Sequence, residues 1–143
     1  MSKVAVIYWS GTGNTEEMAQ SVKAGAEKAG AAVDLFEVES FPVEKFGEYD
    51  GFLFGCPAMG DEVLEEGSYE PFFASVEDKL SGVPVGLFGS YGWGGGAWME
   101  EWAERARGDG AKLVGDGLAV ENSPSDEDLA NCEALGQSLV AAL

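Results

Sequence analysis

Five short apolar runs alternate with helical patterns along the whole chain. Residues 14–29, 69–79, 97–108 and 125–142 have helical spacing, and the apolar runs are KVAVIYW (3–9), AVDLFEV (32–38), GFLFGC (51–56), PVGLFGS (84–90) and KLVGDGLAV (112–120). Strands that are apolar on both faces and alternate with helices indicate a parallel sheet covered on both sides. Right-handed crossovers then predict an α/β fold, a doubly wound sheet of five parallel strands in the order 2-1-3-4-5.

The length and patterning predict one domain over residues 1–143. The 143 residues contain no linker, repeat or low-complexity segment that would divide them. The sequence passes from Met1-Ser2-Lys3 directly into a strand pattern, and no apolar run approaches the roughly 20 residues of a membrane span. We therefore expect a cytoplasmic protein without a membrane partner.

The composition excludes several kinds of chemistry. The chain has no histidine, which excludes histidine general bases, histidine metal ligands and Ser-His-Asp hydrolysis. Cys56 and Cys132 are far apart, form no metal-binding pattern and are expected as buried thiols. The net charge of −18 argues against nucleic-acid binding and predicts attraction to basic protein partners. Solubility and salt tolerance are the alternative explanation of this charge.

The stretch YWSGTGNTEEMA (8–19) places a glycine-rich loop between a strand and a helix. Backbone N–H groups at a helix N-terminus form a ready anion site. The loop lacks the lysine of a nucleoside-triphosphate loop, and Glu16 replaces the third glycine of a dinucleotide loop. The remaining hydroxyl, amide and backbone N–H groups are neutral donors suited to one terminal phosphate. The residues that provide them are Ser10, Gly11, Thr12, Gly13, Asn14 and Thr15. An ordinary helix-capping turn is the alternative interpretation of this loop.

Two more loops are expected at the same edge of the sheet, where ligands of doubly wound folds bind. In SYGWGGG (90–96), Trp93 stands among glycines and is suited to stacking on a flat ring, whereas Trp98 and Trp102 are core candidates. In PAMGDEVLEEGS (57–68), Met59 could cover the other face of that ring. A phosphate, a flat ring and no acid–base machinery together indicate flavin mononucleotide (FMN).

The stretches YWSGTGNT, GCPAMGDEVLEE, GSYGWGGG and VENSP occur in this order and together resemble the short-chain flavodoxins. This resemblance implies a monomeric carrier that moves single electrons at low potential between redox proteins through FMN and is not an enzyme. It also implies a flavodoxin-like three-layer sandwich.

The resemblance distributes the flavin contacts over the three loops. The first loop, residues 10–15, holds the phosphate. One side of the ring is lined by residues of the turn Pro57, Ala58, Met59, Gly60, Asp61 and Glu62, and the other side by Ser90, Tyr91, Gly92 and Trp93. Asn122 lies in VENSP, where the resemblance implies that a further loop of the family approaches the flavin. Pro57 departs from the small polar residue often found there and removes an N–H donor.

Two features of the ring turn predict redox behaviour. Gly60 permits a positive φ, so that a backbone carbonyl can turn toward the ring and stabilise the one-electron-reduced state. The carboxylates of Asp61, Glu62, Glu65 and Glu66 follow in sequence, and we expect them to disfavour added negative charge on the ring.

Two other functions fit the same topology. Phosphoacceptor receiver domains need paired acids after the first strand and an aspartate after the third, where this chain has Trp9-Ser10 and Cys56. An FMN-dependent quinone or azo reductase would need a second pocket for nicotinamide. Turnover with a nicotinamide cofactor and no other protein would distinguish this enzyme from a carrier.

Overall fold

The structure is a computed structural model, and it describes residues 2–59, 64–92 and 95–143. Its sheet is parallel at every pairing, with the order β2-β1-β3-β4-β5, and β6 pairs with β4. The strands are β1 (Lys3–Tyr8), β2 (Ala32–Glu37), β3 (Gly51–Gly55), β4 (Pro84–Tyr91), β5 (Lys112–Leu113) and β6 (Leu118–Glu121). The predicted strand order is confirmed.

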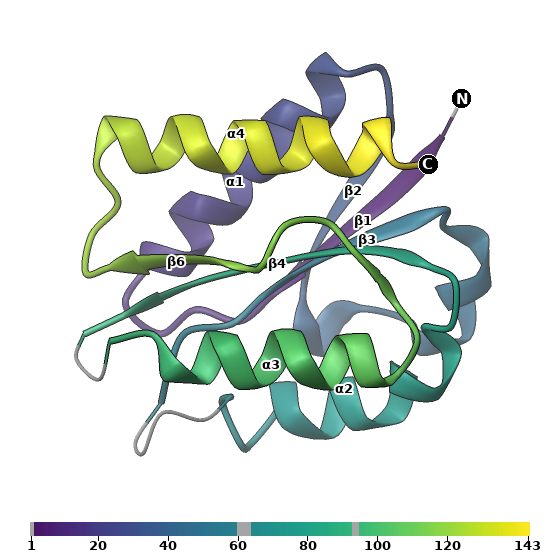
Figure 1. The fold of residues 1–143 in the computed structure, drawn as a ribbon, viewed down its shortest axis with the longest axis horizontal. Coiled ribbons are helices and arrows are strands. Elements are labelled where there is room, and N and C mark those ends of the chain that lie inside the picture. Colours follow the sequence, from purple (N-terminus) through teal and green to yellow (C-terminus); the bar gives the residue numbers. More distant parts are fainter. Residues whose placement is uncertain (1, 60–63, 93–94) are drawn as a thin grey trace.

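Helices cover both faces of the sheet, as Figure 1 shows: α1 and α4 lie on one face, and α2 and α3 on the other. They are α1 (Asn14–Lys28), α2 (Tyr69–Val76), α3 (Ala97–Gly108) and α4 (Asp126–Ala141). In the part of the chain that the structure describes, three short 3₁₀ segments complete the elements: η1 (Val38–Ser40), η2 (Val43–Glu48) and η3 (Glu77–Lys79). Among the described residues, no helix has the length and apolarity needed to cross a membrane.

The single strand expected over residues 112–120 is wrong, because the structure has two short strands there. Lys112 pairs with Pro84, an offset of 28 residues, whereas Leu118 pairs with Phe88, an offset of 30. Two extra residues are therefore accommodated between β5 and β6, where Gly115 and Gly117 have φ of 73° and 90°. Glycine adopts such angles without strain, and the extra residues interrupt the ladder as a bulge does.

The core forms on both faces of the sheet. Under α2 and α3 it is aromatic, and Trp98 and Trp102 are both 2% exposed, as predicted. Under α1 and α4 it contains Met18, Val22 and Leu139. Cys56 and Cys132 are buried free thiols on opposite faces, which confirms the expectation for both.

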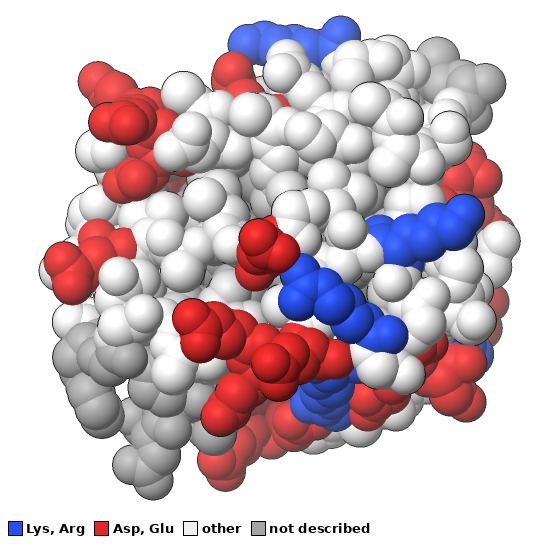
Figure 2. All heavy atoms as spheres, in the orientation of Figure 1, with Lys and Arg blue, Asp and Glu red and all other residues white. Residues whose placement is uncertain are grey.

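Carboxylates outnumber cationic side chains in the chain. Figure 2 shows acidic side chains gathered over the lower half of one face, where α3 lies in Figure 1. The chain has 26 Asp and Glu residues against 8 Lys and Arg. The net charge of −18 therefore gives the molecule a negative field.

Candidate functional site

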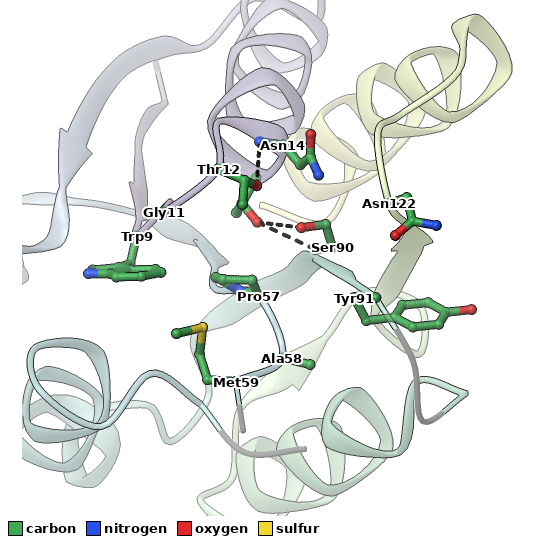
Figure 3. A pocket seen from close by; sticks show the side chains of 12 residues that line it. Trp9, Gly11, Thr12, Asn14, Pro57, Ala58, Met59, Ser90, Tyr91 and Asn122 are labelled. Carbon is green, nitrogen blue, oxygen red and sulfur yellow. Dashed lines mark hydrogen bonds between the residues drawn. The ribbon is translucent and has the colours of Figure 1, made fainter. Parts of the chain in front are cut away.

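A cavity of about 240 Å³ opens at the carboxyl edge of the sheet, where β1, β3 and β4 end. The described residues that line it come from loops far apart in the sequence and meet in Figure 3. They are Trp9, Gly11, Thr12, Asn14, Thr15, Pro57, Ala58, Met59, Ser90, Tyr91, Gly92 and Asn122. All of them except Trp9 were predicted to contact the flavin.

The glycine loop turns tightly into α1. Gly13 occupies the N-cap position with φ of 96°, a conformation that favours glycine. Its N–H donates to Ser10 Oγ (3.0 Å), and the Asn14 N–H donates to Thr12 Oγ1 (3.5 Å). Ser10 and Gly13 thus shape the loop next to the lining residues. The first N–H groups of a helix have no acceptor within it, so this turn presents donors at the positive end of the helix dipole.

The Thr15 side chain faces the protein. Its Oγ1 lies 3.2 Å from Ser90 Oγ and accepts from the Ser90 N–H (3.4 Å). Both side chains are buried, with exposed fractions of 1% and 5%. This pair joins the start of α1 to the end of β4. Because the Thr15 side chain is occupied in this contact, Thr15 can offer an anion its backbone N–H in the first turn of α1.

The other two segments provide flat and apolar surface. The Ala58 N–H donates to Ser90 O (3.0 Å), which holds the segment after β3 against β4. Met59 is 36% exposed at the cavity, and the Tyr91 ring packs on Trp98 with centroids 5.5 Å apart. Asn122 has φ of 58°, which asparagine tolerates better than most residues, and its N–H donates to Tyr91 O (2.7 Å).

Four predicted contact residues lie outside the described part of the chain. They are Gly60, Asp61, Glu62 and Trp93. The expected carbonyl turn at Gly60 and the stacking of Trp93 therefore stay predictions.

Trp9 is a lining residue that was not predicted. A Cβ added at Gly11 would lie 3.0 Å from Cη2 of Trp9, so the indole packs against the backbone of the glycine loop. The available signal was an aromatic residue at the carboxyl end of the first apolar run, directly before the loop. The predicted strand includes this residue, whereas β1 ends at Tyr8.

Glu65, one of the carboxylates expected to add negative charge near the ring, is hydrogen-bonded to the start of α2. Its carboxylate accepts from the N–H groups of Gly67 (2.8 Å), Ser68 (2.8 Å) and Tyr69 (2.9 Å). Burial alone would raise its pKa, but these backbone hydrogen bonds together hold the pKa of Glu65 below its ordinary value. Glu65 therefore caps α2.

The donor set fits a phosphate monoester. Hydroxyl and amide groups surround a helix N-terminus, and no Lys or Arg occurs between Lys3 and Lys23. A dianion bound there is held by neutral donors and the helix dipole. Pro57, Met59 and Tyr91 continue the cavity with surface that suits a flat ring. A doubly wound sheet with such a site at its switch point defines a protein that binds a phosphate-bearing mononucleotide.

Comparison with known proteins narrows this class. The flavodoxin family model matches residues 6–136. The flavodoxin of Megasphaera elsdenii is 45% identical over 97% of this chain and 99% of its own length, and that of Clostridium beijerinckii is 43% identical over 94% and 96%. The solution structure of two-electron-reduced M. elsdenii flavodoxin superposes with a TM-score of 0.87 at 44% identity, covering 96% of this chain and 98% of the other.

The chain belongs to the flavodoxin family, the FMN-binding proteins that carry electrons. It is an electron-transfer protein with redox proteins as partners, and not an enzyme.

Proposed function

We propose that the cavity at the carboxyl edge of the sheet is the FMN site. The observation that supports this best is the convergence of the predicted contact residues of three loops, and of Asn122, on one cavity. When bound, FMN supplies the one-electron chemistry. Residues 10–15 bind its phosphate, and the residues that continue the site are Pro57, Ala58, Met59, Ser90, Tyr91, Gly92 and Asn122. Gly60, Asp61, Glu62 and Trp93 complete this proposal from the sequence alone.

The phosphate assignment is tested with the apoprotein. We expect FMN to bind at least about a hundredfold more tightly than riboflavin, because riboflavin leaves several donors of the loop without an acceptor. FAD should bind weakly, since the loop encloses a terminal phosphate. A Thr12→Ala variant should weaken FMN and leave riboflavin unchanged, as seen by flavin fluorescence titration. Riboflavin binding as tight as FMN binding would contradict the assignment.

We also propose that the surface charge lowers the reduction potential and selects basic partners. A net charge of −18 sets a field that disfavours added negative charge and attracts cationic proteins. Electron transfer to a cationic haem protein should therefore slow as salt rises. An Asp61→Asn, Glu66→Gln variant should raise the potential; Glu65 is left intact because it caps α2. An unchanged potential and salt dependence would limit the charge to a role in solubility.

The adjacent cavity argues against the reductase alternative. It is lined by Tyr8, Trp9, Ser10, Val38 and three carboxylates, those of Glu16, Glu37 and Glu39. These carboxylates would repel the phosphates of a nicotinamide dinucleotide.

Residues 1–143 are further proposed to act as one domain and as a monomer. Light scattering after size exclusion should give the mass of one chain. Unfolding monitored by far-UV and near-UV dichroism should give one coincident transition.

A further inference from the structure

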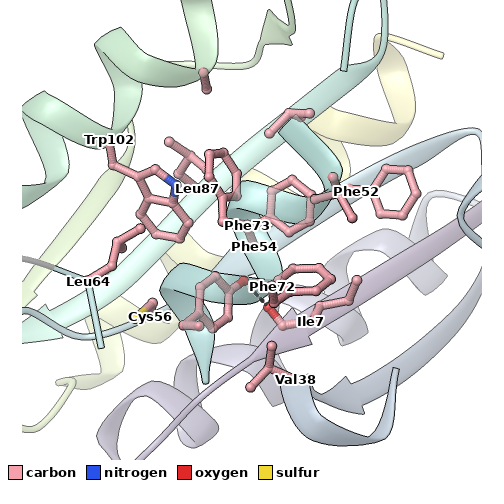
Figure 4. Packing of buried hydrophobic residues seen from close by; sticks show 14 of the residues in the cluster. Ile7, Val38, Phe52, Phe54, Cys56, Leu64, Phe72, Phe73, Leu87 and Trp102 are labelled. Atoms are coloured by element: carbon pink, nitrogen blue, oxygen red, sulfur yellow. Dashed lines mark hydrogen bonds between the residues drawn. The ribbon is translucent and has the colours of Figure 1, made fainter. Parts of the chain in front are cut away.

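Cys56 joins the segment that lines the cavity to the start of α2. Its Sγ accepts from the Glu65 N–H (3.3 Å) and donates to Pro57 O (3.5 Å). Figure 4 shows Cys56 at the same end of the aromatic cluster as Leu64, which precedes Glu65 in the chain. The thiol therefore links the backbone of Pro57 to that of Glu65.

The backbone of Cys56 is fixed independently. Its N–H donates to Phe88 O of β4 (3.1 Å), and its carbonyl accepts from Trp98 Nε1 of α3 (3.2 Å). Ala58 is fixed in turn by Ser90 O (3.0 Å). Pro57 lies between these two anchors, so a change at the Cys56 thiol acts directly on a residue that lines the cavity.

Glu65 anchors the other end of the stretch. Ser68 stands at the N-cap of α2 but makes no capping bond with its side chain, and its Oγ donates to Glu39 instead. The Glu65 carboxylate supplies the cap from outside the helix, and the Glu65 carbonyl accepts from the Glu70 N–H (2.9 Å). A capping side chain commonly comes from the N-cap residue itself, whereas here the cap comes from Glu65, which is thereby fixed to α2.

We propose that Cys56 and Glu65 are positioning residues for FMN. The Cys56 thiol links Pro57, which lines the cavity, to Glu65, and the Glu65 carboxylate links this pair to the start of α2. The inference rests on the proposed FMN site, and it assigns to these two residues a share of the FMN affinity that a purely structural role would not give.

The thiol is tested with the other buried cysteine as a control. Cys56→Ala removes both sulfur contacts and should weaken FMN binding by about three- to tenfold, the range of one net hydrogen bond. Cys56→Ser keeps a donor and an acceptor and should recover part of this loss. Cys132→Ala, on the opposite face of the sheet, should lower the unfolding temperature of the apoprotein and leave the FMN dissociation constant unchanged. Equal FMN affinity in all three variants and the parent would overturn the role of Cys56.

The carboxylate is tested with its neighbour. Glu65→Gln and the exposed Glu66→Gln remove the same charge from adjacent positions, so that any general charge effect is shared. Glu65→Gln should weaken FMN binding by about three- to tenfold because the cap loses an acceptor. Glu66→Gln should stay within about twofold of the parent. Equal shifts in both variants would overturn the role of Glu65.

The Glu65 and Glu66 pair decides the question if Cys56→Ala does not fold. Titration of the parent with FMN distinguishes a failure of the proposed FMN site from a failure of the role of Cys56 and Glu65. A parent that fails to bind FMN overturns the proposed site and this inference with it. A parent that binds FMN while every variant keeps its affinity overturns only the inference.

Discussion

The hydroxyl of Thr15 joins two elements that both end at the cavity. A Thr15→Val variant would leave the buried Ser90 hydroxyl without this partner, and we expect it to lower the free energy of unfolding by about 1–3 kcal/mol. Thr15→Ser keeps the hydroxyl and should lose less. The Thr15→Val, Ser90→Ala double variant removes both polar groups and should cost less than the sum of the single changes. Urea unfolding of the apoprotein measures each value, and strictly additive losses would contradict a coupled pair.

Asp109 follows α3 in a group of charges with Arg105 and Glu77. The Arg105 guanidinium binds Glu77 (2.7 and 3.0 Å) and Glu70 (2.7 and 2.8 Å). Burial, and then the hydrogen bond and charge of Glu77, raise the pKa of Asp109 from 3.8 to about 6. Protonated Asp109 is therefore favoured in the folded state, and its contribution to stability is complete below pH 3.8 and lost as the pH rises through 6.

An Asp109→Asn variant tests this sign. It should unfold at a higher temperature than the parent at pH 8, and the difference should shrink toward pH 4, because the parent side chain is then neutral as well. Glu101→Gln, an exposed change on α3, controls for the loss of one negative charge. A difference that is equal at both pH values would contradict the raised pKa.

The crossing of α1 and α4 depends on two glycines. A Cβ at Gly25 would overlap the carbonyl oxygen of Glu133, and one at Gly136 would overlap the carbonyl oxygen of Val22. Alanine at either position should force the helices apart at a cost of about 1–3 kcal/mol. This cost exceeds the gain of about 1 kcal/mol that alanine brings to a helix interior.

Gly108 provides the control for this change. It is the last residue of α3, and a Cβ there would meet nothing within 4 Å. Gly108→Ala should therefore leave the urea midpoint of the apoprotein unchanged or raise it, whereas Gly25→Ala and Gly136→Ala lower it. If all three variants behave alike, the close approach of the helices does not limit stability.

The net charge of −18 acts on the molecule as a whole. Surface pairs such as Lys28 with Glu133 (3.1 Å) involve few of the carboxylates, so repulsion among the rest should destabilise the fold at low ionic strength. We expect the unfolding temperature of the apoprotein to rise between 10 mM and 0.5 M sodium chloride, because the Debye length falls from about 30 Å to a few ångströms. Potassium chloride should give the same curve. A temperature that falls with salt would mean that the ion pairs outweigh the repulsion.

Local patterns in the sequence determined the layers, the strand order and the place of the cavity. Alternation of apolar runs with helical spacing is a local property, and right-handed crossovers leave few ways to arrange such elements. The loop SGTGNT lies between the first strand and the first helix as predicted, and Gly13 adopts a positive φ where α1 begins. The cap of α4 is equally local, because Ser125 and Asp128 stand three positions apart and form a reciprocal capping pair.

Only the tertiary structure decided what depends on contacts between distant residues. Thr15 and Ser90 are 75 positions apart, and no pattern in either segment says that their hydroxyls meet. The break between β5 and β6 follows from pairing with two parts of β4, which the apolar run KLVGDGLAV does not encode. The capping of α2 by Glu65 also depends on the fold, which brings three backbone N–H groups to its carboxylate. Side-chain direction is set by packing and register, and periodicity alone does not specify either.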